Sequence, residues 1–339
     1  MTTPRSELED LAAEGALDGL DVTRVGDAVR LRGHASARRF YRVTGRGGLT
    51  AILVVYPAHG ADPEVDRFER TTKWFQNAGV PVPRIWQRGR RALVVADAGE
   101  VMLDAIQGPA LSRLYAQAIQ ALCRLQAHGE LLPPPNPDWQ LDRSRFDFEL
   151  GHLEEHGFGG WLPPDGGGAQ RGELYADLAQ RLDAMPRVLC HRDFHSRNLM
   201  VHRGRVVVVD LQDVMSGPVF YDAASLLLDN YVDVPSGIIT DSLGQLSRRS
   251  RLSHHVQSGA AVPSWPRGLS DGDRQAFVLT ALQRSLKALG TFSYQVHVAG
   301  NAEFRQYVPR TWTHVRRLLI DLGWEHRLDA LSAFGKLPA

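Results

Sequence analysis

Cysteine is scarce in this chain of 339 residues, which contains only Cys123 and Cys190. The two lie far apart and lack the spacing of a metal site, so they argue against a structural disulfide and favour a reducing compartment. Net charge is nearly absent too, at +1. A chain without a strong overall charge lacks the general attraction to nucleic acid or anionic membranes that strongly basic proteins have. Any affinity for anions must therefore be local.

Long hydrophobic runs are also missing. The longest apolar stretches, "ALVVADA" and "RVVVVDL", have the length of strands and are too short to span a bilayer. The first twenty residues mix charged and apolar side chains and lack the continuous hydrophobic region of a signal peptide. We therefore expect a cytoplasmic protein, monomeric, without a membrane or nucleic-acid partner.

The sequence changes its pattern near residue 100. Before this point, β-branched and aromatic runs predict strands over 28–33, 39–45, 49–56, 84–89 and 92–98, with one helix over 63–79. After it, apolar residues at helical spacing predict helices over 110–129, 143–157, 172–185 and 221–231, with several more towards the C-terminus. The predicted fold class is α+β, with a small antiparallel β-rich lobe (1–97) and a larger helical lobe (98–339). We expect a ligand-binding cleft near residues 95–100.

The run "RVLCHRDFHSRNLMVHRGRVVVVDLQD", residues 187–213, gathers many ionisable groups between two apolar stretches. Its first interpretation is a zinc site, because His191, Asp193 and His195 alternate and zinc accepts both residue types. The flanking sequence is typical of a loop, however, and no similar set follows. The second interpretation is a charged turn without chemistry.

The third interpretation is phosphoryl transfer, which needs a carboxylate beside the attacking hydroxyl, oxygen ligands for Mg²⁺ and positive donors for the phosphates. The run supplies Asp193, then Asn198 five residues later, and Asp210 after the turn "HRGR" and an apolar strand. A loop and a hairpin of this size can bring the three together. Mg²⁺ prefers the carboxylate and amide oxygens that Asp210 and Asn198 offer.

This pattern, H-x-D-x-x-x-x-N followed by a hydrophobic strand and Asp, resembles the catalytic loop and metal aspartate of the protein-kinase-like fold. The continuous form "CHRDFHSRNLM…VVVVDLQDVMSGPVFYDAASLLLD" is closer to the aminoglycoside/choline phosphotransferase family than to protein kinases. Within that family it is similar to the cell-wall sugar kinases that phosphorylate N-acetylmuramate and N-acetylglucosamine at the anomeric hydroxyl. The segments "GHASARRFYRV" (33–43) and "LKALGTFS" (286–293) resemble parts of the same kinases.

The resemblance implies ATP and Mg²⁺ as cofactors and a bilobal kinase-like fold. It assigns the general-base and acceptor-binding position to Asp193, and the magnesium-ligand positions to Asn198 and Asp210. His191 is expected to keep the shape of the catalytic loop. Asp222, at the start of a helix, is expected to brace that loop.

The segment 33–43 lacks the G-x-G-x-x-G spacing of kinase phosphate loops. Its Ser36, Arg38 and Arg39 are nevertheless the expected donors to the nucleotide phosphates, the alternative being a basic hairpin tip in water. The third strand, "LTAILVVYP", has no lysine where kinases usually place one. Arg39 or Arg42 is the expected replacement.

The segment "LVVADAGE" resembles the family hinge, where the backbone of Val95 and Ala96 would read an adenine edge. Asp97 would bind ribose or cap the next turn. Glu149 matches a substrate-pocket acid of the sugar kinases, and Asp213 would either face the acceptor sugar or serve a turn.

Three functions stay open at this stage. The first is an anomeric kinase for N-acetylmuramate or N-acetylglucosamine, feeding UDP-sugar synthesis in peptidoglycan recycling. The second is a kinase of the same fold for another hydroxyl compound, such as an aminoglycoside or choline. The third is a nucleotide-binding pseudokinase. Abundant arginine in the helical half favours a neutral or anionic acceptor, and the intact Asp193, Asn198 and Asp210 set disfavours a pseudokinase.

Overall fold

The computed structural model describes residues 4–21, 25–31, 38–45, 47–57, 61–162, 166–249, 265–266 and 269–336. Their contacts divide the chain into two compact units: Met1–Met102 with Leu199–Asp213, and Leu103–Asn198 with Val214–Ala339. The predicted α+β class is confirmed, because the first unit is built on an antiparallel sheet and the second is mainly helical. The lobe boundary between residues 97 and 98 stays a prediction.

The first unit is built on five antiparallel strands in the order β1-β2-β3-β5-β4. Their bounds are Val25–Leu31, Arg39–Gly45, Thr50–Val55, Ile85–Arg88 and Ala92–Ala96 for β1 to β5. Successive side chains of a strand point to opposite faces of the sheet. In the central strand β3, Leu53 and Val55 therefore enter one core and Val54 enters the other.

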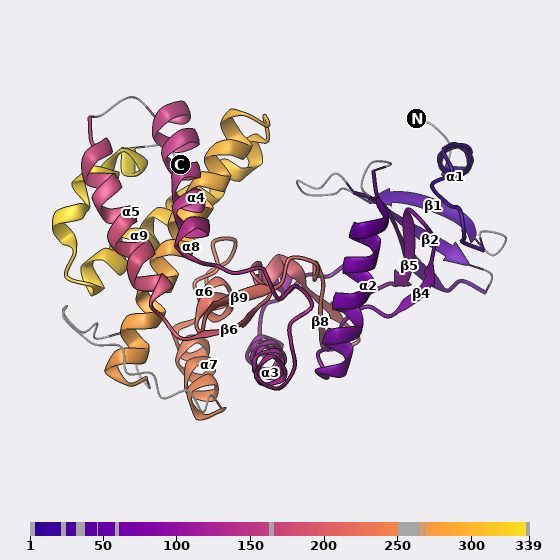
Figure 1. The fold of residues 1–339 in the computed structure, drawn as a ribbon, viewed down its shortest axis with the longest axis horizontal. Coiled ribbons are helices and arrows are strands. Elements are labelled where there is room, and N and C mark those ends of the chain that lie inside the picture. The colour runs from indigo at the N-terminus through magenta and orange to yellow at the C-terminus, as the bar shows by residue number, and fades with distance from the viewer. Residues whose placement is uncertain are drawn as a thin grey trace. The chain divides into compact units, whose positions relative to one another are not determined.

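Two helices of the first unit pack on opposite faces of this sheet (Figure 1). Helix α1, Pro4–Ala13, places Leu11 in the core that contains Leu53. Helix α2, Ala61–Asn77, places Val65 and Phe68 in the core that contains Val54. The sequence predicted α2 alone, so α1 is an addition to the expected lobe.

A β-hairpin from later in the chain completes the first unit. Strands β7, Leu199–His202, and β8, Arg205–Val208, are joined by Arg203 and Gly204, whose φ values are 50° and 73°. Two successive positive φ angles give the mirror-image turn that matches the twist of a two-residue hairpin. The hairpin is attached by hydrogen bonds from Val201 N to Val101 O, 2.7 Å, and from Val208 N to Pro81 O, 2.8 Å.

The second unit consists of helices around α8, with one pair of short antiparallel strands, β6 and β9. Its α-helices are α3 Ala110–Leu131, α4 Arg143–Leu153, α5 Gly168–Asp183, α6 Tyr221–Leu227, α7 Ser236–Arg249, α8 Asp271–His297 and α9 Val308–Asp321. The strands are Arg187–Cys190 and Met215–Pro218. A π-helix, η3 Glu154–Trp161, follows α4, and the 3₁₀ segments are η2 Leu103–Ala105, η4 Ser196–Asn198, η5 Ala302–Tyr307, η6 Glu325–Arg327 and η7 Asp329–Lys336.

Helix α8 is buried along most of its length and contacts α4, α5, α6, α9, η3 and η5. It begins at a cap, where the Ser270 hydroxyl accepts from the Asp273 N–H at 3.2 Å. Gly290 lets α4 approach closely, because a Cβ there would lie 2.9 Å from Leu153 Cα. α8 is therefore the scaffold that presents side chains to the loop containing Asp193.

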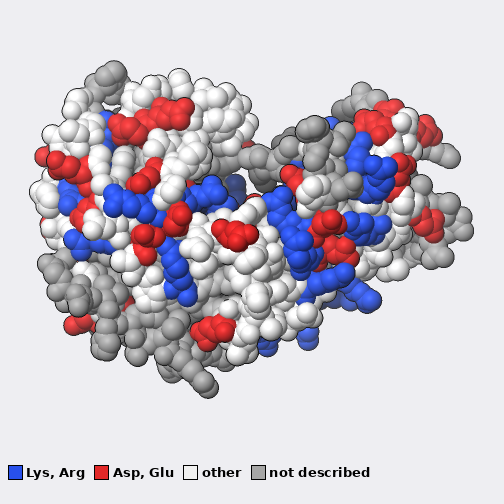
Figure 2. Space-filling view, viewed as in Figure 1, with Lys and Arg blue, Asp and Glu red and all other residues white. Residues whose placement is uncertain are grey.

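Charge on the surface follows the balanced composition. Figure 2 shows Lys and Arg interspersed with Asp and Glu on the face drawn, in both units. Among the residues that the structure describes, no helix has the length and apolar character that crossing a bilayer requires.

Candidate functional site

The charged run begins in β6 and continues as a loop held by a buried carboxylate. Asp222 Oδ2 accepts from the backbone N–H of His191 at 2.6 Å, and its Oδ1 accepts from that of Arg192 at 2.9 Å. Arg192 has a φ of 81°, which is costly for a residue with a side chain and persists only when such bonds fix it. Burial raises the pKa of Asp222, in the first turn of α6. Asp222 thus lies where a bracing residue was expected, and His191 is buried with its ring edge-on to Phe194.

A second buried carboxylate, Asp229, holds the far end of the loop and was not predicted. It accepts from the backbone N–H of Ser196 and from that of Tyr231, both at 2.7 Å. Burial raises the pKa of Asp229 to about 6. Its only signal in the sequence is the last Asp of "YDAASLLLD", which lies 33 residues after Ser196 in the chain and meets the loop only in the fold.

Asp193 lies in this loop with its carboxylate towards α8. Its Oδ1 is 3.3 Å from Arg284 Nη2 and 3.6 Å from Lys287 Nζ. Burial alone would raise the pKa of this carboxyl, but the positive charges of Lys287 and Arg284 outweigh burial and hold the pKa well below its usual range. The side chain is still 37% exposed. An ionised carboxylate is thus available to accept a hydrogen bond from a hydroxyl group.

Glu149, the predicted substrate acid, is buried and fully engaged. Its carboxylate accepts from Gln283 Nε2 at 2.8 Å and from Tyr221 OH at 3.3 Å. It also lies 3.2 Å from Arg192 Nη2 and 3.3 Å from Lys287 Nζ. A sugar would have to displace one of these partners to reach Glu149. In this structure the residue positions the cations around Asp193.

Three cations, Arg192, Arg284 and Lys287, therefore surround the two carboxylates of Asp193 and Glu149. Burial and the neighbouring Arg284 lower the pKa of Lys287. The ammonium group lies between two carboxylates at distances longer than a good hydrogen bond, so it can turn towards another anion. This cluster, which we call the α8 cation cluster, was missed by sequence reasoning except for the resemblance of segment 286–293.

Asn198 ends the loop, in η4. Its Nδ2 donates to the backbone carbonyl of Asp193 at 2.9 Å. That bond fixes the amide and commits its nitrogen, so the amide oxygen is the atom left for a cation. An amide oxygen is a donor type that Mg²⁺ accepts.

In the first unit, Asp210 follows β8 with a φ of 64°. Its Oδ1 accepts from Arg38 Nη2 at 2.9 Å and from Gln212 Nε2 at 3.0 Å. Gln212 Oε1 in turn accepts from Arg38 Nη1 at 3.0 Å, and Gln212 Nε2 donates to Asp213 at 3.1 Å. The structure therefore gathers Arg38, Asp210 and Asp213 around Gln212, which sequence reasoning did not select.

The other expected phosphate donors are placed differently. Ser36 lies outside the described residues. Arg39 pairs with Glu14, the residue that follows α1, at 2.8 Å. Arg42 pairs with Asp97 at 2.7 Å and donates to the carbonyl of Gly99 at 3.0 Å. Because Arg39 and Arg42 both have carboxylate partners elsewhere, Arg38 is the arginine of this segment that accompanies Asp210.

The hinge residues occupy the end of β5. Asp97 caps the following turn, accepting from the Gly99 N–H at 2.8 Å, and its pKa is lowered by Arg42 against the opposing effect of burial. Val95 pairs with β3 and β4. The N–H of Ala96 donates to the carbonyl of Arg84 at 2.8 Å. An adenine edge would therefore not be read by the N–H of Ala96, which the sequence had suggested.

The zinc interpretation of the charged run finds no support in the geometry. Within the described parts of the chain, one group of at least three His, Cys, Asp or Glu side chains is close enough to hold an ion, and it consists of His152, Glu155 and His156. His191, Asp193 and His195 do not form such a group.

The comparisons with known proteins concern the family and the fold. Residues 27–247 match the phosphotransferase enzyme family. Two curated relatives are both called N-acetylmuramate/N-acetylglucosamine kinase. The one from Pseudomonas putida is 28% identical over 320 residues, which cover 90% of this chain and 85% of the relative. The one from Pseudomonas aeruginosa is 30% identical over 322 residues, which cover 90% of this chain and 86% of the relative. Among solved structures, an amicoumacin kinase in complex with AMP-PNP, Ca²⁺ and Ami has a TM-score of 0.60 at 14% identity, covering 88% of this chain and 92% of that chain. A choline/ethanolamine kinase family protein from Mesorhizobium loti has a TM-score of 0.58 at 17% identity, covering 94% of this chain and 98% of that chain. The structural likenesses establish the fold.

Proposed function

Because the chain belongs to the phosphotransferase enzyme family, we propose that it is an ATP-dependent kinase for the anomeric hydroxyl of N-acetylmuramate or N-acetylglucosamine. Its product would be the sugar 1-phosphate, which supplies UDP-sugar synthesis in peptidoglycan recycling. The names of the two Pseudomonas relatives support this acceptor class. We expect a monomeric enzyme that works in the cytoplasm, with lobes over residues 1–97 and 98–339.

The observation that carries the proposal is the accessible, ionised carboxylate of Asp193 in a loop that Asp222 and Asp229 hold by hydrogen bonds. A hemiacetal hydroxyl is more acidic than an ordinary alcohol, so Asp193 can orient it by accepting its hydrogen bond. The carboxylate takes up the proton late, when bonding to phosphorus has made the hydroxyl more acidic. Asp222 and Asp229 hold the loop through three of its backbone N–H groups, those of His191, Arg192 and Ser196, so the carboxylate does not have to be ordered during the reaction.

For the cofactors, Asn198 and Asp210 offer an amide oxygen and a carboxylate oxygen, which fit Mg²⁺. When bound, that ion would neutralise charge on the phosphates of ATP. We propose that Arg38 donates to those phosphates and that Val95, Ala96 and Asp97 lie at the adenosine end. Arg39 is paired with Glu14 and is a weaker candidate.

The α8 cation cluster supports an acceptor that is neutral or anionic. Arg192, Arg284 and Lys287 bring three positive side chains together beside Asp193, and such an arrangement attracts an anionic group. The lactyl carboxylate of N-acetylmuramate has the matching charge. A polycationic aminoglycoside would instead meet like charge.

The test is a phosphate-transfer assay with ATP and Mg²⁺ against amino sugars, aminoglycosides and choline. We expect phosphorylation of N-acetylmuramate or N-acetylglucosamine with loss of reducing-end reactivity, which marks the anomeric position. Asp193→Asn should lower kcat by about 10²- to 10⁴-fold, the usual contribution of an acid–base group. Asp147→Asn, which changes an exposed carboxylate of α4, is the matched control. Activity on an aminoglycoside or choline alone would support the second function instead, and unchanged kcat in Asp193→Asn would refute the role of Asp193.

A further inference from the structure

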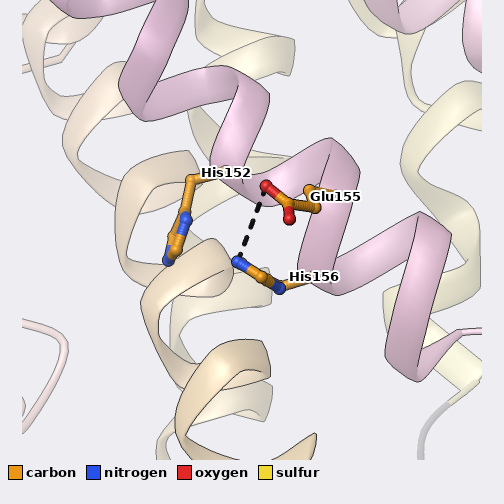
Figure 3. Close-up of side chains that lie close together, drawn as sticks. All are labelled: His152, Glu155 and His156. Atoms are coloured by element: carbon orange, nitrogen blue, oxygen red, sulfur yellow. Dashed lines mark ion pairs between the residues drawn. The ribbon is translucent and has the colours of Figure 1, made fainter. Parts of the chain in front are cut away.

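The helix that carries Glu149 changes its geometry one turn later. Helix α4 ends at Leu153 and the chain continues as the π-helix η3, Glu154–Trp161. A π-helix is a rare conformation that often marks a functional position. The side chains of His152, Glu155 and His156 lie together at this junction (Figure 3).

The donor atoms of these three side chains are close to one another. One ligand atom from each lies within 4.8 Å of the other two. His156 Nε2 is 3.7 Å from Glu155 Oε2, and the two imidazole rings are 4.2 Å apart between centroids, at 77°. Bonds of about 2.1 Å to zinc place tetrahedral ligand atoms about 3.4 Å apart. The carboxylate and the His156 imidazole are near that separation, and the His152 ligand atom lies within 4.8 Å of both.

The environment keeps the imidazoles in place. The ring of Tyr294, from α8, packs against both, with centroid distances of 5.6 Å to His152 and 5.1 Å to His156. This packing orients the two rings before an ion arrives, and the neutral imidazole is the form that binds metal.

We propose that His152, Glu155 and His156 form a binding site for a borderline transition-metal ion, with Zn²⁺ as the representative. Two imidazole nitrogens and one carboxylate oxygen suit zinc, nickel or copper and do not suit Mg²⁺, which prefers oxygen alone. Three protein ligands leave one position for water. This site uses none of the residues proposed for phosphoryl transfer, so the inference stands apart from the proposed function.

The site would join the end of α4 to the start of η3. Glu149 lies three residues before His152 on α4 and contacts Lys287 of α8. Bound metal would therefore hold the segment that positions the α8 cation cluster. Because the folded chain offers these ligands together and the unfolded chain does not, metal should raise the thermal unfolding midpoint.

The experiment uses the full-length chain without an affinity tag, stripped with a chelator and measured in excess Mg²⁺. Calorimetric titration with Zn²⁺ is expected to show one site, and Co²⁺ as a probe is expected to give the visible absorption of a tetrahedral site. His152→Gln and His156→Gln should each weaken binding by more than the roughly 10- to 100-fold that loss of an outer-shell partner costs. His326→Gln, which changes an exposed histidine outside the cluster, and Asp210→Asn should bind as the wild type does.

Thermal unfolding of the metal-free variants separates loss of the site from loss of the fold. If His156→Gln keeps its wild-type unfolding midpoint without metal but no longer gains stability from Zn²⁺, the site is established. Absence of the Co²⁺ band in the wild type, or unchanged Zn²⁺ affinity in both histidine variants, would overturn the proposal.

Discussion

Arg38 donates from Nη2 to Asp210 Oδ1 at 2.9 Å, and Gln212 bonds to both residues. The sequence separation is 172 residues, yet both belong to the first unit. The third strand carries no lysine, and this arginine stands instead beside the carboxylate that we propose as a Mg²⁺ ligand. Without a bound metal ion, the guanidinium group of Arg38 neutralises the charge of Asp210. When a divalent ion neutralises Asp210 instead, the guanidinium group can turn to phosphate oxygens.

Arg38→Ala should therefore have two effects of opposite sign. Losing one fixed donor to the phosphates is expected to lower kcat/KM for ATP about 100-fold. Removing the cation beside Asp210 is expected to strengthen binding of the divalent ion in the absence of ATP. Steady-state kinetics measure the first effect, and titration with Mn²⁺ followed by electron paramagnetic resonance measures the second.

Arg39→Ala is the matched comparison, because it removes the neighbouring arginine, which pairs with Glu14. We expect kinetics close to those of the wild type. Equal losses in the two variants would show that the phosphate role is not specific to Arg38.

Lys287→Met should change the pH dependence of the reaction. Lys287 is the leading positive charge that lowers the pKa of Asp193, so its loss raises that pKa towards the ordinary value of a carboxyl group. Protonated Asp193 cannot accept the hydroxyl proton. The fall of kcat/KM in acid should consequently begin at a higher pH in the variant than in the wild type.

Lys287→Arg keeps the positive charge, so the fall of kcat/KM in acid should begin at the same pH as in the wild type. Lys287→Met also leaves Glu149 with less compensation, and breaking such a buried pair costs about 3–5 kcal/mol of stability. Combining it with Glu149→Gln should recover part of that loss. Superimposable pH profiles for wild type and Lys287→Met would rule out the electrostatic role.

Asp229 should make the stability depend on pH. Burial raises the pKa of Asp229 in the folded protein to about 6, above the ordinary aspartate value of 3.8. The folded state therefore holds the proton more tightly than the unfolded state, and this stabilisation is complete below pH 3.8 and is lost as the pH rises through 6. The free energy of unfolding of the wild type, relative to Asp229→Asn, should fall by roughly 3 kcal/mol between pH 4 and pH 7.

Urea unfolding at intervals across that range measures the difference. Asp229→Asn has no charge to titrate at this position, so the comparison cancels the other carboxyl groups of the chain. A difference between the two proteins that stays constant with pH would contradict the raised pKa.

Gly290→Ala should destabilise the second unit. Its new methyl group would meet the backbone of Leu153 at 2.9 Å, where α4 crosses α8, and backbone cannot rotate away. Overpacking of this kind costs about 1–3 kcal/mol. Gly172→Ala, in α5, has no atom within 4 Å of the new methyl and should stabilise the protein by up to about 1 kcal/mol, because alanine favours a helix over glycine. The midpoints of thermal and chemical unfolding should therefore fall in Gly290→Ala and rise in Gly172→Ala.

Local patterns predicted most elements, because alternation and helical spacing are properties of neighbouring residues. The strand predicted over 39–45 is Arg39–Gly45, and the helix predicted over 63–79 is Ala61–Asn77. The helix predicted over 143–157 is α-helical only to Leu153, since the π-helix that follows depends on its packing against α8. Helix α1 was missed because its mixed charged and apolar residues give no strong period.

The site was predictable where its residues are near in sequence and not where packing alone unites them. Asp193 and Asn198 came from one short motif, whereas Arg284 reaches Asp193 across 91 residues. Arg38 and Arg39 show the same limit. Arg39 begins β2 and pairs with Glu14, whereas Arg38, the residue before the strand, lies over Phe40. No local pattern tells which of the two arginines meets Asp210.

The chain leaves the first unit after Met102 and returns to it for Leu199–Asp213. A fragment cut at residue 102 would lack the hairpin that bonds to Pro81 and Val101, and it would lack Asp210. Chimaeras between relatives therefore need two exchanged pieces, because residues 1–102 and 199–213 have to come from the same parent.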